Sequence, residues 1–315
     1  MVPPFTRRRL IGLASSPLLA GCAAPSLVTR DTGRDPFEGG IGGTGIVGVL
    51  TEFGSLRVNG LRVETTGRTR VVTALGPATE AALAPGMALT IMADRTRTAT
   101  VARHVRIDFP LVGRLERTGA GLSVNGVPLR LERGAAQGAG FGARVAVSGL
   151  WEAGAVVASR IDAAPFAEDV IAGPVERDGA SGLAIGGAPV RLAAGAAFPP
   201  SGAYATAIGR HGAAGFVADR LALGRFVSGA RGLRQLAVEG YLQPVRADPG
   251  FRIAGLGHSF AEDLALAPLS GSRAVYVGPY DGRFAARAGY VLPEGVAARR
   301  RLLGEGYDGR LAAQA

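Results

Sequence analysis

The sequence has one cysteine, no lysine, few aromatic residues and no long apolar run, and each shortage excludes a class of protein. A lone cysteine, Cys22, can form neither an intramolecular disulfide nor a thiolate metal cluster. The apolar stretch before it is shorter than the roughly 20 residues that a membrane-spanning helix needs. Aromatic residues make up only 6% of the chain and are not interleaved with arginine, so nucleic-acid binding is not favoured.

Common catalytic motifs are also missing. The sequence contains no GxSxG, no HExxH, no CxxC pair and no acidic calcium-binding loop. Its three histidines, His104, His211 and His258, lie far apart in the chain. They are interpreted as exposed or locally hydrogen-bonded imidazoles, with a shared metal site as the less favoured alternative. We therefore predict a protein that is not an enzyme and holds no cofactor and no metal.

Two adjacent carboxylate pairs have similar surroundings, namely Glu168-Asp169 and Glu262-Asp263, each preceded by Phe-Ala. Neighbouring residues of a strand point to opposite faces, which disfavours an acid/base pair. We interpret both pairs as solvated linker charges. A hydrolase with an active site between structural units remains the least favoured function class.

Glycine, proline and arginine are what the chain has in abundance. With 49 glycines and 19 prolines, it is rich in turn formers, which favours many short elements over long helices. All 35 basic residues are arginine, against 25 acidic residues. Removal of Arg7, Arg8 and Arg9 with a signal peptide would leave a net charge of +7. Such a surface attracts anionic partners through salt-sensitive forces.

The first 21 residues are typical of an export signal. Three arginines, Arg7–Arg9, precede a weakly apolar segment from Leu10 to Leu19. The segment ends in four residues that resemble the lipobox of bacterial lipoproteins: Leu19, Ala20, Gly21 and Cys22. The resemblance implies cleavage before Cys22 and acylation of its thiol, with several acyl chains giving a stable membrane anchor. Ala23 after the cysteine implies the outer membrane, so we expect a lipid-anchored protein that faces the periplasm.

The export route stays open between two alternatives. Arg7 and Arg8, followed by Arg9, Leu10 and Ile11, resemble a twin-arginine signal. An arginine-rich Sec signal fits nearly as well. Both routes lead to the same lipidated tether, which we place at residues 22–38.

A glycine tract follows the tether from Gly39 to Gly48 and contains two overlapping GxGxxG patterns. A dinucleotide site needs a strand before these glycines and a helix after them, because the pyrophosphate sits on the helix N-terminus. Here a polar tether precedes the tract and a strand-like segment from Ile46 to Leu50 follows it. We interpret the glycines as backbone that turns tightly or passes close to another strand.

Internal repetition is the strongest indication of the fold. A hairpin pattern recurs about every 65 residues, which indicates a repeat architecture. The hairpins span Leu56–Val63, Leu122–Leu129, Leu183–Val190 and Phe251–Leu256. Their central residues are Asn59-Gly60, Asn125-Gly126, Gly186-Gly187 and Ala254-Gly255. Asn-Gly and Gly-Gly between alternating apolar residues predict a type I′ turn, in which both central residues have positive φ.

Each repeat closes with a second pair of alternating strands, such as Val145–Gly149 followed by Val157–Ile161. In the first repeat, Ala78–Ala84 is long enough for two helical turns. The order is therefore strand, strand, strand, short helix, strand, strand, which matches a small Greek-key OB barrel. We predict an all-β chain built as a tandem array of about four five-stranded OB-like barrels of about 65 residues each, with short helices.

Several motifs of the first repeat resemble those of a bacterial lipoprotein family that is built from tandem small β-barrel modules and has no known function. These are the opening GGIGGTGI at Gly39–Ile46, then Phe53–Ser55, Asn59-Gly60 and Gly86-Met87. The resemblance extends to about Val291. It implies the fold and the envelope location, and no catalytic or binding residue comes with it.

These patterns divide the chain into a signal peptide, a tether, four barrels and a tail. The boundaries are 1–21 for the signal peptide, 22–38 for the lipidated tether, 39–110, 111–166, 167–232 and 233–293 for the four barrels, and 294–315 for a basic C-terminal tail. The favoured function is a non-enzymatic interaction or structural module at the outer membrane, with an envelope protein as a possible partner. The alternative is a binding protein for an anionic envelope polymer, using arginine-rich barrel faces.

Overall fold

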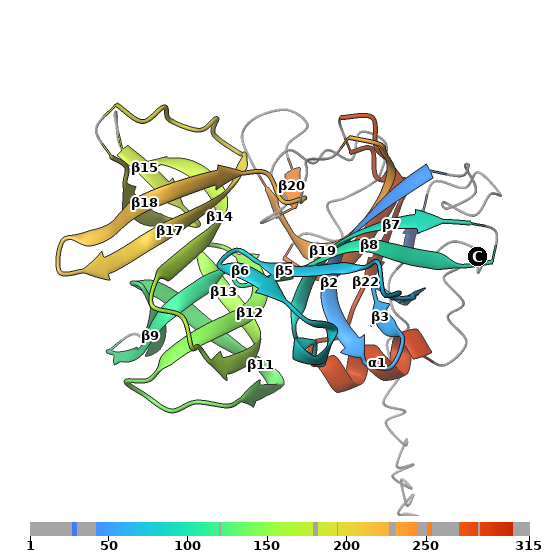
Figure 1. The fold of residues 1–315 in the computed structure, drawn as a ribbon, viewed down its shortest axis with the longest axis horizontal. Helices are drawn as coiled ribbons and strands as arrows, with labels where there is room; N and C mark the ends of the chain where they lie inside the picture. Colours follow the sequence, from blue (N-terminus) through green and yellow to red (C-terminus); the bar gives the residue numbers. More distant parts are fainter. Residues whose placement is uncertain are drawn as a thin grey trace, which may run out of the picture.

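The fold is mostly β, as Figure 1 shows. The computed structural model describes residues 27–29, 42–96, 98–119, 121–178, 182–193, 195–226, 231–244, 251–253, 271–282 and 284–304. The signal peptide, Cys22 and His258 lie outside these residues, as do Glu262-Asp263 and the predicted turn at Ala254-Gly255. Among the described residues, no helix is long and apolar enough to cross a membrane.

Alternation of apolar and arginine side chains forms the first hairpin. Leu56, Val58, Leu61 and Val63 are buried, while Arg62 on the opposite face is exposed. This is the period of two that a strand with one buried face requires. The hairpin therefore contributes four apolar side chains to a barrel interior.

The first ring is a closed five-stranded barrel. Its strands are β2 (Gly42–Glu52), β3 (Leu56–Val58), β4 (Leu61–Val63) continued by β5 (Arg70–Thr73), β7 (Ala88–Arg95) and β8 (Thr100–Asp108). β2 pairs with β3 and β7, β3 with β4, and β7 with β8. The ring closes where β5 runs parallel to β8 and Glu64 bridges to Val101. The short β6 (Gly76–Ala78) pairs with β5 at the sheet edge.

Two further sets of five strands pair in the same cyclic order. The second ring contains β9 (Leu111–Thr118), β10 (Gly121–Val124), β11 (Val127–Gln137), β12 (Arg144–Glu152) and β13 (Ala155–Ala163). The third ring contains β14 (Asp169–Asp178), β15 (Gly182–Ile185), β16 (Ala188–Arg191), β17 (Tyr204–Gly212) and β18 (Gly215–Leu223). In both, the third strand runs parallel to the fifth, and the fourth pairs with the first.

The C-terminal strands complete the larger sheet. They are β19 (Leu233–Pro244), β20 (Phe251–Ile253), β21 (Arg273–Pro279) and β22 (Ala288–Val291). β19 pairs with β20 and β21, and β21 pairs with β22. β22 pairs in turn with β1 (Leu27–Thr29), so part of the predicted tether is a strand. Among the described residues of this region, the pairing does not return to its start.

First strands join neighbouring rings. β19 runs parallel to β2, and β14 pairs with β9. Figure 1 accordingly shows two lobes, one with β2 and β19 and the other with the second and third rings. In the larger lobe, Gly43 lies so close to β19 that an added Cβ would come within 2.6 Å of the Gly232 carbonyl oxygen. The glycine tract of β2 thus permits a close approach between strands.

Both Asn-Gly turns fasten a neighbouring strand. Asn59 and Gly60 have φ of 54° and 76°, and Asn125 and Gly126 have the same two values, as a type I′ turn requires. The Asn59 amide donates to Val47 of β2 and to Ala237 of β19, at 2.9 and 3.0 Å. The Asn125 amide likewise donates to the carbonyl oxygens of Val112 and Val170 on β9 and β14. Each asparagine therefore satisfies one carbonyl in its own ring and one in the next.

In the third ring a tryptophan side chain takes the place of the turn asparagine. Gly186 and Gly187 have φ of 59° and 85°, so the turn is again left-handed, but it has no asparagine. Trp151 from β12 packs against Gly173 and Gly186, and its Nε1 donates to the Ala172 carbonyl at 2.8 Å. The indole is 3% exposed. Trp151 therefore fills the space and supplies the hydrogen bond that the asparagine side chain provides in the other two turns.

A buried ionic cluster connects the two lobes. Glu132 of β11 pairs with Arg273 of β21 at 2.9 Å and with Arg299. Arg273 also pairs with Glu239 of β19 at 2.6 Å. Burial alone would raise the pKa of Glu132, but Arg273 and Arg299 outweigh it and lower that pKa. Two carboxylates balance two guanidinium groups, which is the condition for burying charge at tolerable cost.

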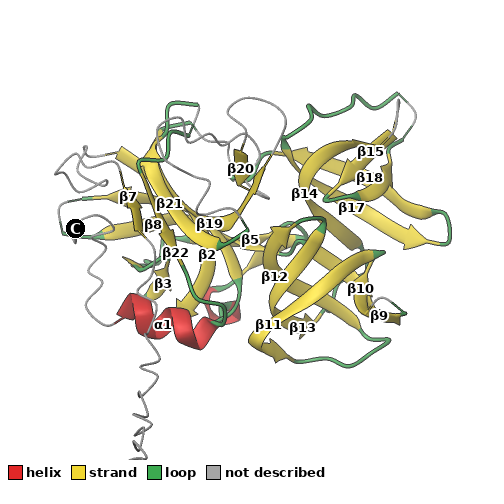
Figure 2. Cartoon of the chain, turned by 180° about the vertical axis from the view of Figure 1, so that it is seen from behind, coloured by secondary structure: helices red, strands yellow, loops and turns green. Residues whose placement is uncertain are grey.

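Two predicted segments differ from the structure. Residues 294–315 were expected to form a basic tail, yet Val296–Gly304 forms the helix α1, and its Arg299 is fully buried. α1 contacts β2 and β11, and Figure 2 shows it below β2. Within Ala78–Ala84 only Glu80–Ala82 forms a single 3₁₀ turn, η1, because Ala78 pairs in β6 and Leu83 is extended. Both differences come from tertiary contacts that local propensity does not contain.

Candidate functional site

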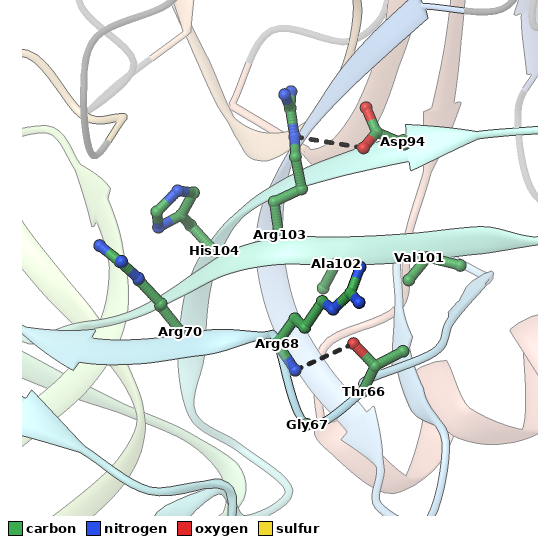
Figure 3. Close-up of a pocket in the computed structure, with 9 residues that line it drawn as sticks. All are labelled: Thr66, Gly67, Arg68, Arg70, Asp94, Val101, Ala102, Arg103 and His104. Atoms are coloured by element: carbon green, nitrogen blue, oxygen red, sulfur yellow. Dashed lines mark hydrogen bonds and ion pairs between the residues drawn. The ribbon is translucent and has the colours of Figure 1, made fainter.

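An arginine-lined pocket of about 940 Å³ opens on the first ring, beside β5, β7 and β8 (Figure 3). Its polar lining comes from Arg68 in the turn before β5, Arg70 at the start of β5, Asp94 in β7, and Arg103 and His104 in β8. The lining therefore contains three arginines and one carboxylate, which pairs with Arg103. Such a lining favours an anionic ligand.

A β-bulge places two polar side chains of β8 side by side. Met92 pairs with His104 and Ala93 pairs with Ala102, so Arg103 is an extra residue without a partner on β7. A bulge of this kind turns two successive side chains toward one face of the sheet. Figure 3 shows Arg103 and His104 on the same side of β8, with the Arg70 side chain next to the imidazole. Arg70 is also the parallel pairing partner of His104.

Two threonines hold the turn that carries Arg68. The Thr66 backbone N–H donates to Thr69 Oγ1 at 2.9 Å, and the Thr69 N–H donates back to the Thr66 carbonyl at 2.8 Å. Thr69 Oγ1 then donates to the Ala102 carbonyl of β8 at 2.7 Å. The turn is thereby fastened to the strand that carries Arg103. The backbone segments that carry Arg68 and Arg103 are therefore joined by this hydrogen bond.

The charges of the pocket are accessible. Arg103 pairs with Asp94 at 3.4 Å, but both side chains are about half exposed, at 44% and 57%. Exposed pairs of this kind contribute little and exchange readily for a ligand. Arg68 and Arg70 are exposed and make no ion pair with any carboxylate that the structure describes. His104 is half buried, and its pKa is lowered by burial and then by Arg70 and Arg103.

The residues predicted from sequence are distributed over several places. His104 lines the pocket, whereas His211 lies in the third ring, where its backbone N–H donates to Asp169 at 2.7 Å. Among the described residues, no group of three or more His, Cys, Asp or Glu side chains is arranged to hold a metal ion. The six turn residues Asn59, Gly60, Asn125, Gly126, Gly186 and Gly187 are structural and lie outside the pocket lining.

The interpretation of Glu168-Asp169 as solvated charge was wrong for Asp169. Asp169 is 8% exposed, and its carboxylate pairs with Arg144 at 2.8 Å and accepts the His211 N–H. Glu168 is partly exposed and pairs with Arg220 at 3.0 Å. Strand β14 begins at Asp169, so the two neighbours point to different sides. Asp169 therefore belongs to the contact between the second and third rings.

The same bulge recurs in the other two rings, with different side chains. Ser159 is the extra residue of β13 and Asp219 that of β18. Ser159 is 1% exposed and donates to the Gly86 carbonyl of the first ring at 2.6 Å. The bulge of the second ring is therefore covered by the first ring, whereas that of the first ring opens into the pocket.

Sequence reasoning missed the pocket, although the residues were visible. Of its charged residues only His104 was singled out, and Arg68, Arg70 and Arg103 were not. The available signal was the alignment of Arg103-His104 with Ser159-Arg160 and Asp219-Arg220 in the three repeats. No family model, curated protein or solved structure matches the chain.

Proposed function

We propose that this protein is a non-enzymatic lipoprotein of the bacterial outer membrane that binds an anionic envelope polymer in the arginine-lined pocket. The pocket is the observation that carries the ligand class, because its lining includes Arg68, Arg70 and Arg103 but only one carboxylate, Asp94. Guanidinium groups recognise oxyanions through charge-assisted and often bidentate hydrogen bonds. The pocket thus favours the anionic polymer over an unspecified protein partner.

The architecture we propose is a tandem array of OB-like barrels. Support comes from the strand order of the three rings, in which the third strand lies parallel to the fifth and the first pairs with the fourth. The C-terminal strands would form the fourth unit. Barrels of this class offer an open face to extended polymers such as oligosaccharides.

The membrane address rests on the N-terminal sequence. Cys22 is the only thiol, so Cys22→Ser removes the only residue that can carry the proposed lipid. We expect the variant to lose acylation and either to become soluble or to stay attached through an uncleaved signal. Carbonate washing of membranes, with a mass measurement of the N-terminus, tests this. A processed Cys22→Ser protein that still sediments with the outer membrane would contradict the anchor.

Binding to a polymer of fixed charge tests the ligand class. The probe is fluorescent dextran sulfate, and the protein is the mature lipidated chain in detergent. We expect the double variant Arg70→Gln/Arg103→Gln to weaken binding roughly tenfold, since each guanidinium supplies a charge-assisted hydrogen bond. Added salt should weaken binding to the wild type.

Arg220→Gln is the matched control, because Arg220 occupies the position of His104 in the third ring and is 62% exposed. It removes one arginine from a barrel surface and leaves the pocket intact. We expect a change of less than about twofold, from the loss of net charge alone. Equal losses per arginine in the control and in the pocket variant would show that net charge, and not the pocket, binds the polymer.

A further inference from the structure

His104 lies among arginine side chains of the first ring. Arg70 is its pairing partner on β5, and Arg103 precedes it on β8. Arg68, in the turn before β5, also lines the pocket. On β7, Met92 pairs with His104, and Asp94 lies two residues further along. Asp94 pairs with Arg103. Arg106, the next outward residue of β8, is engaged with Asp108 at 2.7 Å.

The His104 Nδ1 atom is buried and has no hydrogen-bond partner among the described residues. A charged histidine normally donates through both nitrogens, to a carboxylate, a carbonyl or water. Burial and the positive charges of Arg70 and Arg103 therefore disfavour the protonated form of the imidazole and lower the pKa of His104. A bound oxyanion would reverse the sign of the local field, since it neutralises Arg70 and Arg103 and brings negative charge to the imidazole.

We propose that an oxyanion of the sulfate or phosphodiester class, bound between Arg70 and Arg103, draws a proton onto His104, so that affinity for the polymer rises as pH falls. This inference rests on the proposed function, because it concerns the same pocket. The lowered pKa of His104 in the free protein, caused by burial and then by Arg70 and Arg103, supports it.

The direction of the pH effect follows from linkage. In the free protein, burial, Arg70 and Arg103 lower the pKa of His104, whereas in the proposed complex this pKa is higher. The complex therefore takes up a proton in the interval between the two values. Affinity is constant above this interval, rises as pH falls through it and levels off below it.

The first experiment measures binding of dextran sulfate to the mature protein between pH 8 and pH 5.5. Sulfate esters stay ionised across this range, so only the protein titrates. We expect the wild type to bind roughly three- to tenfold more tightly at pH 5.5, because up to one proton is linked. His104→Gln should lose most of this increase, so that its affinity at pH 5.5 stays close to its own affinity at pH 8.

His211→Gln is the matched control. His211 is a half-buried histidine of the third ring, and its contact with Asp169 uses the backbone N–H, which the substitution retains. We expect the wild-type pH dependence in this variant. An equal loss of pH dependence in His104→Gln and His211→Gln, or none in either, would overturn the proposal.

Proton NMR of the His104 ring gives a second test that needs no variant at the site. We expect the pKa of His104 to rise by about one unit when dextran sulfate is added. If the wild type binds the polymer and needs Arg70 and Arg103, but the His104 pKa does not move, this inference fails while the proposed function stands. If the wild type does not bind at any pH, both fail.

Discussion

The first and second rings carry a β-bulge at the same point of their fifth strands and use it in opposite ways. In β13 the bulge presents Ser159, whose small side chain is buried against the Gly86 carbonyl of the first ring. In β8 it presents Arg103, which is 44% exposed at the mouth of the pocket. One backbone feature thus serves a contact between rings in one place and a candidate binding site in another. The two bulges differ in side-chain size and charge and in whether a neighbouring ring covers them.

The first and third rings differ in a similar way at their hairpin turns. Asn59 reaches from its turn to a carbonyl of its own ring and to one of β19. Gly186 has no side chain, and the indole of Trp151 from the second ring occupies the space beside this turn. The backbone φ values of the two turns are alike, at 54° and 59°. Equivalent positions can therefore be filled from within a ring or from its neighbour.

The largest expected effect is at Trp151. Trp151→Ala leaves a cavity at the third turn and an unsatisfied Ala172 carbonyl, and should cost about 4 kcal/mol. Chemical unfolding of the mature protein gives the measurement. Gly186→Asn alone should also destabilise, because its Cβ would collide with the indole.

The double variant Trp151→Ala/Gly186→Asn sharpens the comparison. If the asparagine can replace the indole, the double variant should be at least about 1 kcal/mol more stable than the sum of the single losses. Strict additivity would show that the turns of the first and third rings are not interchangeable.

A smaller loss is expected from exchanging side chains between the bulges. Ser159→Arg buries a guanidinium at a position that is 1% exposed, and should cost about 3 kcal/mol. Ser159→Ala is the control, since it removes one hydrogen bond and should cost about 1 kcal/mol. The midpoint of urea unfolding measures both. A harmless Ser159→Arg would mean that the second bulge is as open as the first.

The Asn-Gly turn of the first ring tests the backbone itself. Gly60 has φ of 76°, where a β-branched side chain is strained, so Gly60→Val should cost about 2 kcal/mol. Gly60→Asn should be much milder, because asparagine tolerates this region. Thermal melting of the two variants decides between them. Equal losses would contradict a left-handed requirement at this turn.

The smallest effect is expected at the open bulge. Arg103→Ser places the side chain of the second bulge in the first and should change the free energy of unfolding by less than about 0.5 kcal/mol, because the ion pair with Asp94 is exposed. Binding of dextran sulfate should nevertheless weaken in the same variant. A large loss of stability with unchanged binding would assign Arg103 a structural role.

Local signals account for what could be predicted. Asn59-Gly60 and Asn125-Gly126 indicate their turns because positive φ at two successive residues is a property of the turn alone. Trp151 gave no such indication, since its place depends on Gly173 and Gly186 in the next ring. The site was harder still, because Arg70 and His104 meet only through the parallel pairing of β5 with β8.

The sequence by itself determined a mostly β chain with left-handed hairpin turns, because alternation and turn chemistry act over a few residues. It also supplied the lipobox at Cys22, which remains a prediction. Only the tertiary structure decided that Arg299 is buried against Glu132 and that Asp169 joins two rings. It also decided that the bulge at Arg103 faces a pocket while the one at Ser159 faces a neighbour. Which ring covers which bulge depends on how whole rings pack, and pairing between distant strands leaves no pattern in a short stretch of sequence.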